Sequence, residues 1–186
     1  MKTLVVVTHP SLETSAINKR WVEELRKYPE KYTVHELSKA YPDGNIDVAK
    51  EQKLVESHGN LIFQFPIYWF NCPPLLKKWF DDVLAYGWAY GSSGDKLKNR
   101  KVALGVTAGI KKEDYSENGR YRYTLEQLLA PFETSFLYCN ADYRSFFAYY
   151  GTENEPGEID PGAENVPAAS RLEKSAQDYL NFVDSL

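Results

Sequence analysis

Short apolar segments alternate with helical segments along most of the chain, and this alternation restricts the fold more than any other feature. Buried parallel strands read as short apolar runs bounded by turn residues, and such runs cover residues 3–8, 32–37, 61–65, 101–107 and 143–149. Helical patterns separate them, over residues 15–28, 47–57, 74–85 and 124–138, and a last helix is predicted from about Pro167. Residues 151–161 are rich in Gly, Pro, Glu and Asn, which predicts a mobile surface loop.

Strands that are separated by helices pair in parallel through right-handed crossovers. We therefore expect an α/β fold: an open, doubly wound sheet of five parallel strands with helices on both faces, in the flavodoxin-like order 2-1-3-4-5. The chain is long enough to bury a sizeable core, so we expect residues 1–186 to form a single domain. The ligand site of such a sheet is the crevice at the carboxyl ends of its strands, which directs attention to the loops after strands one, three and four.

The charge of the chain argues against two classes of partner. The net charge is −4 and the isoelectric point is about 5.5, which gives no electrostatic footprint for nucleic acid or for an anionic membrane surface. The apolar run at the N-terminus is only a few residues long and reads as a strand rather than a signal peptide. No stretch is long enough to span a bilayer, so we expect a soluble, cytoplasmic protein with no nucleic-acid partner.

Cysteine and histidine are too few and too scattered for a metal or redox motif. The two cysteines are Cys72 and Cys139, and the three histidines are His9, His35 and His58. None of these shows the spacing of metal ligands. We therefore expect no metal site, and Cys72 reads as a small packing residue.

The loop after the first strand has the composition of a phosphate site. Residues 9–18, HPSLETSAIN, place a histidine, hydroxyl groups and an amide before or at the start of a helix. The free amide groups at a helix N-terminus bind phosphate readily. The loop has no Gly-rich fingerprint and no P-loop lysine, which argues against a dinucleotide Rossmann site and an ATPase. Helix capping by Ser15, with His9 as an ordinary loop residue, is the alternative interpretation.

The loop after the third strand is unusually aromatic. Pro66 is expected to end the strand ladder because it lacks a donor, and Pro73 and Pro74 suit a first helical turn. Between them lie three aromatic residues and an asparagine, at positions 68–71. Aromatic side chains line pockets and cap cores alike, so both readings stay open. Aromatic residues make up 15% of the chain, which favours either a flat ligand or an oligomer interface.

The loop after the fourth strand reads Thr107-Ala108-Gly109-Ile110 and is followed by Tyr115. A glycine at this place lets the backbone approach a flat ring closely, although a turn after a strand often carries glycine for local reasons. Together the three loops are expected to converge on one crevice.

At four separated places the chain resembles the flavodoxin-like NAD(P)H:quinone oxidoreductase family. The likeness extends from Thr3 to about Tyr149 and is strongest to short bacterial members, namely the general stress protein 14 type and the ancillary quinone reductases of glutathione-gated potassium efflux. The matching blocks are His9-Pro10 with Ser15 and Asn18, Tyr41-Pro42-Asp43 with Asn45-Ile46-Asp47, Pro66-Ile67-Tyr68-Trp69 with Pro73-Pro74-Leu75-Leu76-Lys77, and Gly87-Trp88-Ala89-Tyr90-Gly91.

The resemblance implies a role for each of the three loops. The residues expected at the flavin phosphate are His9, Ser15, Ala16, Ile17 and Asn18. Those expected around the isoalloxazine ring are Pro66, Ile67, Tyr68, Trp69, Thr107, Ala108, Gly109 and Ile110. Trp69 or Phe70 would stack on the nicotinamide or the quinone. Tyr115 would lie beside the pyrimidine end of the flavin, where its hydroxyl and backbone donors near Gly109 would stabilise the negative charge of the reduced ring. Tyr90 would come from a partner subunit and close the pocket.

The implied activity is a two-electron, ping-pong reaction in which a hydride passes from NAD(P)H through the flavin to a quinone. FMN is expected rather than FAD, because the chain lacks the longer tail that holds an adenine. A homodimer is expected, with residues 86–90 at the interface. Two alternatives are a regulatory subunit that docks on a membrane potassium-efflux transporter and, less favoured, a one-electron flavodoxin.

The chain departs from the family pattern at three places. Many relatives read Thr-Thr-Gly-Gly where this chain has residues 107–110, so a β-branched Ile110 stands where the backbone is expected to need unusual dihedrals. Tyr121 stands where some animal relatives have a histidine, which removes a Tyr-His proton relay. Basic residues on the following loop are candidates for the choice between NADH and NADPH: Lys111, Lys112, Arg120 and Arg122.

Overall fold

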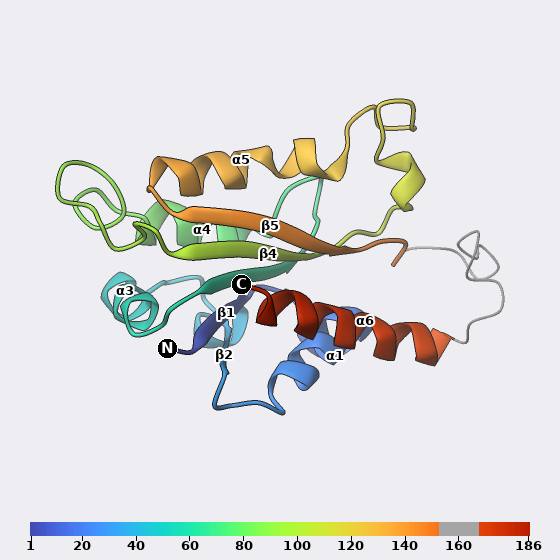
Figure 1. Ribbon diagram of the computed structural model, residues 1–186, viewed down its shortest axis with the longest axis horizontal. Coiled ribbons are helices and arrows are strands. Elements are labelled where there is room, and N and C mark those ends of the chain that lie inside the picture. The colour runs from blue at the N-terminus through green and yellow to red at the C-terminus, as the bar shows by residue number, and fades with distance from the viewer. Residues whose placement is uncertain (153–167) are drawn as a thin grey trace.

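A five-stranded parallel sheet forms the centre of the computed structural model, which describes residues 1–152 and 168–186. Its strand order is β2-β1-β3-β4-β5 (Figure 1), and every neighbouring pair is parallel. The strands are β1 (Thr3–Val7), β2 (Tyr32–Glu36), β3 (Leu61–Pro66), β4 (Lys101–Thr107) and β5 (Asp142–Tyr149). The expected fold class is confirmed. Residues 153–161 of the expected surface loop lie outside the described residues.

Helices cover both faces of the sheet. They are α1 (Ala16–Leu25), α2 (Leu37–Ala40), α3 (Val48–Glu56), α4 (Pro74–Val83), α5 (Leu125–Tyr138) and α6 (Ala168–Asp184). Figure 1 shows α1 and α6 on one side of the strands and α4 and α5 on the other. The four-residue α2 was not predicted, and Leu37, expected in the second strand, begins this helix instead.

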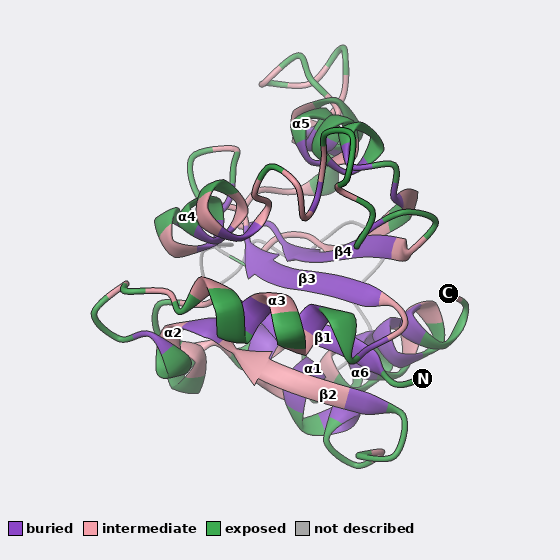
Figure 2. Ribbon diagram, turned by 90° about the vertical axis from the view of Figure 1, so that its left-hand side faces the viewer, coloured by how far each residue is buried: buried purple, intermediate pink, exposed green. Residues whose placement is uncertain are grey.

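The two faces of the sheet form two hydrophobic clusters, because successive strand residues point to opposite sides. Val5 and Val7 of β1 pack with α1 and α6, whereas Leu4 and Val6 pack with α4 and α5. Figure 2 shows β1 and β3 buried and the edge strand β2 mostly half-buried. The carboxyl ends of the central strands are therefore held by the core itself.

Pro66 ends β3, as expected, but its missing donor does not interrupt the pairing with β4. It is the last residue of β3 and pairs with Thr107 of β4, and the Ile67 N–H donates to the Thr107 carbonyl at 2.7 Å. Alternate residues of a parallel strand direct their N–H groups to opposite neighbours, so the donor that Pro66 lacks is missing on the β1 side. The chain continues beside β4 for one residue before it turns.

A buried carboxylate joins the elements around α3. Glu51 is fully buried and accepts hydrogen bonds from Tyr41 at 2.8 Å and from the indole of Trp79 at 2.8 Å, and it bonds Nε2 of His35 at 2.9 Å. Burial alone would raise the pKa of Glu51, but these hydrogen bonds, that of His35 foremost, outweigh it and hold the pKa below its usual value. The ionised carboxylate thus ties α3 to β2, α2 and α4.

The C-terminal helix α6 is fixed to the sheet by stacked rings. Tyr179 lies against Trp21 of α1 with ring centroids 4.3 Å apart, and the Trp21 indole donates to the Ser175 hydroxyl at 2.8 Å. A Cβ at Gly105 would lie 2.7 Å from the Tyr179 hydroxyl oxygen, so glycine makes room for the ring. Among the described residues this buried hydroxyl has no hydrogen-bond partner. Burial raises the pKa of Tyr179 far above its usual value.

A membrane span requires a helix that is both long and largely apolar, and the helices of this fold differ from that. Within residues 1–152 and 168–186, none combines the length and the apolar character that a membrane crossing requires.

Candidate functional site

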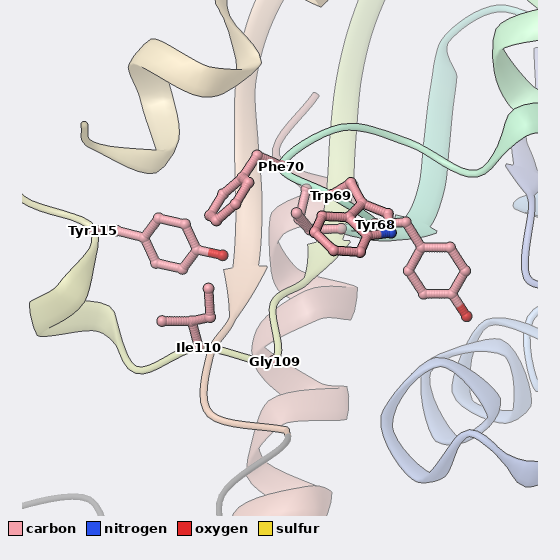
Figure 3. Close-up of a pocket in the computed structure, with 7 residues that line it drawn as sticks. Tyr68, Trp69, Phe70, Gly109, Ile110 and Tyr115 are labelled. Atoms are coloured by element: carbon pink, nitrogen blue, oxygen red, sulfur yellow. The ribbon is translucent and has the colours of Figure 1, made fainter. Parts of the chain in front are cut away.

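Two adjoining cavities lie at the carboxyl ends of β1, β3 and β4. The first, here the aromatic cavity, has a volume of about 460 Å³ and is lined by Ile67, Tyr68, Trp69, Phe70, Gly109, Ile110 and Tyr115 (Figure 3). The second, here the helix-end cavity, has a volume of about 500 Å³ and is lined by His9, Thr14, Ser15, Ala16, Ile17, Pro66, Ile67, Tyr68, Thr107, Gly109, Tyr149, Gly151 and Thr152. The two cavities share three lining residues, Ile67, Tyr68 and Gly109, and so lie side by side. The three loops therefore meet at one crevice, as expected.

A tight hairpin forms one wall of the aromatic cavity. The N–H groups and carbonyls of Tyr68 and Asn71 exchange two hydrogen bonds, at 2.8 and 2.9 Å. The two residues between them, Trp69 and Phe70, have φ values of 49° and 59°. Positive φ at both central residues defines a type I′ turn, which normally takes Asn-Gly or Asp-Gly. Two bulky aromatic residues here are costly, because a left-handed backbone disfavours any residue with a Cβ.

The aromatic residues of this hairpin differ in burial. Trp69 is 95% exposed and Tyr68 is 39% exposed, so neither caps the hydrophobic core. Phe70 is partly buried against the core, and its ring centroid lies 5.2 Å from that of Tyr121. The core-capping interpretation therefore holds only for Phe70. A strained turn that directs an indole into solvent beside a cavity is a feature typical of binding sites.

The start of α1 provides amide groups to the helix-end cavity. Ser15 occupies the N-cap position, but its side chain makes no capping hydrogen bond. Its hydroxyl instead accepts from the Asn18 side chain at 3.2 Å. The first amides of an α-helix have no acceptor within the helix, and those of Ala16 and Ile17 belong to residues that line the cavity. Capping therefore does not explain Ser15, and the geometry favours an anion at this helix end.

His9 lies at the other side of the helix-end cavity. Its Nδ1 accepts a hydrogen bond from the Ser11 N–H at 3.0 Å, so the neutral ring carries its proton on Nε2. Partial burial lowers the pKa of His9. At neutral pH the ring is thus uncharged and offers one N–H donor.

Asn18, expected at the flavin phosphate, lines neither cavity. It is 1% exposed, and its amide donates to the Thr107 hydroxyl at 2.9 Å and to the Ser15 hydroxyl at 3.2 Å. The Gln64 amide donates to the Asn18 side chain and carbonyl at 3.2 and 3.1 Å. Asn18 therefore acts through other residues: it connects the start of α1 to the ends of β3 and β4. A sequence position does not tell whether a side chain faces a cavity or the core behind it.

The loop after β4 places its residues at different depths. Ala108 is fully buried and lines neither cavity, whereas Ile110 lines the aromatic cavity. Neither Gly109 nor Ile110 is among the positive-φ residues of the described chain, so the expectation of unusual dihedrals at Ile110 was wrong. Without a positive φ at Ile110, the loop does not impose the left-handed backbone that a β-branched residue disfavours.

Tyr115 closes the aromatic cavity opposite the hairpin. It is 6% exposed, and its ring packs beside Tyr121 and Tyr150 with centroids 6.3 and 5.8 Å away. Figure 3 shows its hydroxyl directed into the cavity, toward Phe70 and Ile110. Neighbouring aromatic residues thus hold the phenol in place at the aromatic cavity.

Two other expected residues lie elsewhere. Tyr90 lines a separate groove of about 390 Å³ between α4 and α5, where its ring centroid is 5.3 Å from that of Tyr138. Within one chain it does not reach the crevice. Cys72 is 8% exposed, and burial raises its thiol pKa to about 11, so it is a protonated packing residue at neutral pH.

Four lining residues of the helix-end cavity were not predicted: Thr14, Tyr149, Gly151 and Thr152. Tyr149 ends β5, so the rule that parallel strands present their carboxyl ends at one edge was sufficient to find it. Gly151 and Thr152 follow directly. Thr14 lies in a short 3₁₀ turn (Leu12–Thr14), which periodicity does not reveal.

The fold agrees with comparisons against known proteins. Residues 1–173 match the family model described as flavodoxin-like fold. The chain belongs to the flavodoxin-like fold family. General stress protein 14 of Bacillus subtilis is 45% identical to this flavodoxin-like chain over 183 residues, which are 98% of the chain and 97% of the relative. YrkL, an NAD(P)H oxidoreductase of the same organism, is 45% identical over 152 residues, 82% of the chain and 87% of the relative.

Another relative is named as an ancillary protein of a transport system, the glutathione-regulated potassium-efflux system ancillary protein KefG of Cronobacter sakazakii. It is 38% identical over 138 residues, which are 74% of this chain and 74% of the relative. Among solved structures, general stress protein 14 of Treponema denticola, in complex with FMN, is 47% identical and aligns over 100% of this chain and 99% of that one, with a TM-score of 0.89. An NADPH-quinone reductase from P. pentosaceus is 25% identical, with a TM-score of 0.78 and coverage of 96% and 97%. The resemblance to the flavodoxin-like oxidoreductases is confirmed.

Proposed function

We propose that this chain is an FMN-dependent NAD(P)H:quinone oxidoreductase that transfers two electrons by a ping-pong route. The observation that carries the proposal is that the helix-end cavity adjoins the aromatic cavity, with Ile67, Tyr68 and Gly109 lining both. One end offers unsatisfied amides and the other offers aromatic walls. The FMN in the Treponema relative and the reductase activity named for the P. pentosaceus protein support it.

The residues present fit FMN at both of its ends. A phosphate suits the helix end, because the Ser15 side chain leaves the first amides of α1 without a capping partner. The neutral His9 ring adds one N–H donor. A flat ring suits the cavity between Tyr68 and Tyr115. We assign the phosphate to His9 and residues 15–17, with Asn18 as a positioning residue.

FMN, when bound, accepts a hydride from one substrate and gives it to another. The protein supplies orientation and electrostatics. With FMN bound, the Tyr115 hydroxyl and the backbone at Gly109, which line the aromatic cavity, would lie beside the ring, and we assign them the stabilisation of the negative charge that the ring carries when reduced. The exposed Trp69 and the half-buried Phe70 form the outer wall, where a nicotinamide or a quinone would stack in turn.

Two measurements test this proposal. The purified chain, reconstituted with FMN, is expected to show the absorbance of oxidised flavin, which NADPH or NADH bleaches and a benzoquinone restores. His9→Ala is expected to weaken FMN binding by about tenfold or more, because a hydrogen bond to a charged group is lost, while riboflavin, which lacks the phosphate, binds the variant and the wild type alike. Absence of flavin after reconstitution, or equal losses for FMN and riboflavin, contradicts the proposal.

We further propose a homodimer in which Tyr90 of one copy completes the pocket of the other. The groove that holds Tyr90 is flanked by exposed aromatic rings, with Tyr86 70% and Tyr138 69% exposed, which is unusual for a free surface. Light scattering gives the mass directly. Tyr90→Ala is expected to raise the KM for quinone without loss of bound FMN, and a monomeric wild type contradicts this assignment.

A second candidate function is a regulatory subunit of a potassium-efflux transporter, favoured by the 38% identity to KefG. Co-purification with such a transporter that survives His9→Ala and Tyr115→Phe would indicate that docking, rather than turnover, is the main role. Loss of co-purification in both variants would tie docking to the flavin site.

A further inference from the structure

Two arginines of the loop after β4, Arg120 and Arg122, have no carboxylate partner among the described residues. They lie in the rim loop, defined as residues 111–123, which begins with a short 3₁₀ turn (Lys112–Asp114). Arg120 and Arg122 form no ion pair and no side-chain hydrogen bond within residues 1–152 and 168–186. Four other arginines of the described chain are bonded to carboxylates or backbone carbonyls: Arg20, Arg26, Arg100 and Arg144. In a chain of net charge −4, unpaired arginines beside a cavity point to an anionic ligand.

Aromatic stacking holds one of these arginines at the cavity. The Arg120 guanidinium lies over the Tyr121 ring, 5.5 Å from its centroid. Tyr121 in turn packs against Phe70 and Tyr115, with centroids 5.2 and 6.3 Å away, and both of these line the aromatic cavity. The cation is thus connected to the cavity wall through a single ring.

The backbone of the rim loop is fixed at its middle. A Cβ at Gly119 would lie 2.6 Å from the Glu113 carbonyl and 2.7 Å from that of Asp114, so the loop closes tightly on itself there. Arg122 has a φ of 62°, a left-handed conformation that arginine rarely adopts. The loop therefore presents its two arginines from a strained, closed turn.

The acidic residues of the rim loop do not neutralise these arginines. Glu113, Asp114 and Glu117 lie in the same segment, yet none forms an ion pair with Arg120 or Arg122. Lys111 differs from the arginines because it is engaged in an interaction within the chain. Of the four basic candidates in this loop, the two arginines have the geometry that suits phosphate, since a planar guanidinium binds two oxygens at once.

We propose that Arg120, assisted by Arg122, binds the phosphate groups of the dinucleotide donor while its nicotinamide enters the aromatic cavity. This inference rests on the proposed function, because it assumes that a reduced dinucleotide is the donor. Two phosphate sources share this chemistry: the pyrophosphate, which both donors carry, and the 2′-phosphate, which only NADPH carries. The hydride-accepting ring and its phosphate site at α1 are not involved.

The test measures the KM of three donors with four proteins: wild type, Arg120→Gln, Arg122→Gln and a control, Arg144→Gln. The control removes an exposed arginine of β5 that pairs with Asp142. The donors are NADPH, NADH and dihydronicotinamide riboside, which lacks every phosphate. Arg120→Gln is expected to raise the KM for a phosphorylated donor by about tenfold, the loss of a charge-assisted hydrogen bond, with kcat and the quinone KM unchanged. Arg122→Gln is expected to have a smaller effect, and Arg144→Gln none.

The pattern of losses identifies the phosphate. A loss confined to NADPH assigns the 2′-phosphate, and equal losses for NADPH and NADH assign the pyrophosphate. Unchanged KM values for both donors overturn the inference, as does an equal loss for the riboside, which would show that Arg120 only supports the cavity wall. Calorimetry of NADP⁺ binding to each variant gives a second readout. If the wild type neither retains FMN nor oxidises any donor, the proposed function fails, which is a different outcome.

Discussion

Replacing Trp69 with asparagine is expected to make the flavin-free protein more stable. Trp69 has a φ of 49° at the first central position of a type I′ turn, a conformation that costs about 1–2 kcal/mol for a residue with a Cβ and that asparagine tolerates well. Its side chain is 95% exposed, so almost no burial is lost. The free energy of unfolding of Trp69→Asn is therefore expected to rise by about 0.5–1 kcal/mol, or about 1–4 °C in Tm for a chain of this length.

The assay must separate this gain from effects of a bound ligand, which raises apparent stability by mass action. Urea unfolding is followed by far-UV circular dichroism on flavin-stripped protein, since the substitution removes a tryptophan and alters the fluorescence. Tyr123→Asn is the matched control: it removes an aromatic side chain that is 58% exposed, at a residue outside the left-handed region. The control is expected to change the free energy of unfolding by less than about 0.5 kcal/mol.

The same substitution is expected to weaken turnover. A stacking contact contributes about 0.5–1.5 kcal/mol beyond area burial, so the KM for quinone should rise about 2- to 10-fold in Trp69→Asn. A variant that unfolds at the wild-type urea concentration, or below it, while Tyr123→Asn is unchanged, would refute the argument that the hairpin stores strain for function.

Three further predictions concern buried polar groups. Asn18→Ala removes the amide that joins α1 to β4 and leaves the Gln64 amide with fewer acceptors. It should lower the free energy of unfolding, measured by urea titration, by about 1–3 kcal/mol. It should also weaken FMN binding, measured by flavin fluorescence. The pKa of Glu51 is lowered in the folded state, so its contribution to stability is complete above the usual value of 4.5 and declines as the pH falls through the folded-state pKa. The difference in unfolding free energy between wild type and Glu51→Gln, measured in urea from pH 7 downward, should therefore shrink below that value. A difference that stays constant with pH would contradict this. Tyr179→Phe removes a buried hydroxyl that has no partner among the described residues. Thermal unfolding should therefore show an unchanged or slightly higher Tm, which corresponds to a gain of up to about 1 kcal/mol in the free energy of unfolding. A marked loss of stability would reveal a hydrogen bond to that oxygen.

The strands and long helices were predictable because the hydrophobic pattern of each extends over enough residues to distinguish a helix from a strand. The apolar run of β4 and the alternation around it gave its bounds, Lys101–Thr107, without error. The four residues of α2 are fewer than two helical turns, so they show no hydrophobic periodicity that would predict a helix. Leu37 was therefore assigned to the preceding strand. Short elements that follow a strand directly are determined by contacts with the core rather than by local pattern.

The location of the site was predictable and its local geometry was not. The edge rule for parallel sheets predicts from the sequence that the loops at His9, Trp69 and Gly109 meet. The turn at residues 69–70 was not foreseen, because neither tryptophan nor phenylalanine is a residue that such turns prefer. Asn18 was assigned to the ligand because its position in the sequence matches a family motif, whereas the direction of its side chain depends on the packing of α1 against β4.

The brace formed by Asn18, Thr107 and Gln64 has an evolutionary consequence. It anchors one half of the crevice in the interior of the protein, where substitutions are felt throughout the structure. The other half stands on a turn and a surface loop, which tolerate change. Descendants of such a chain can acquire new oxidants by altering the outer half alone, while the inherited half keeps the same prosthetic group across lineages.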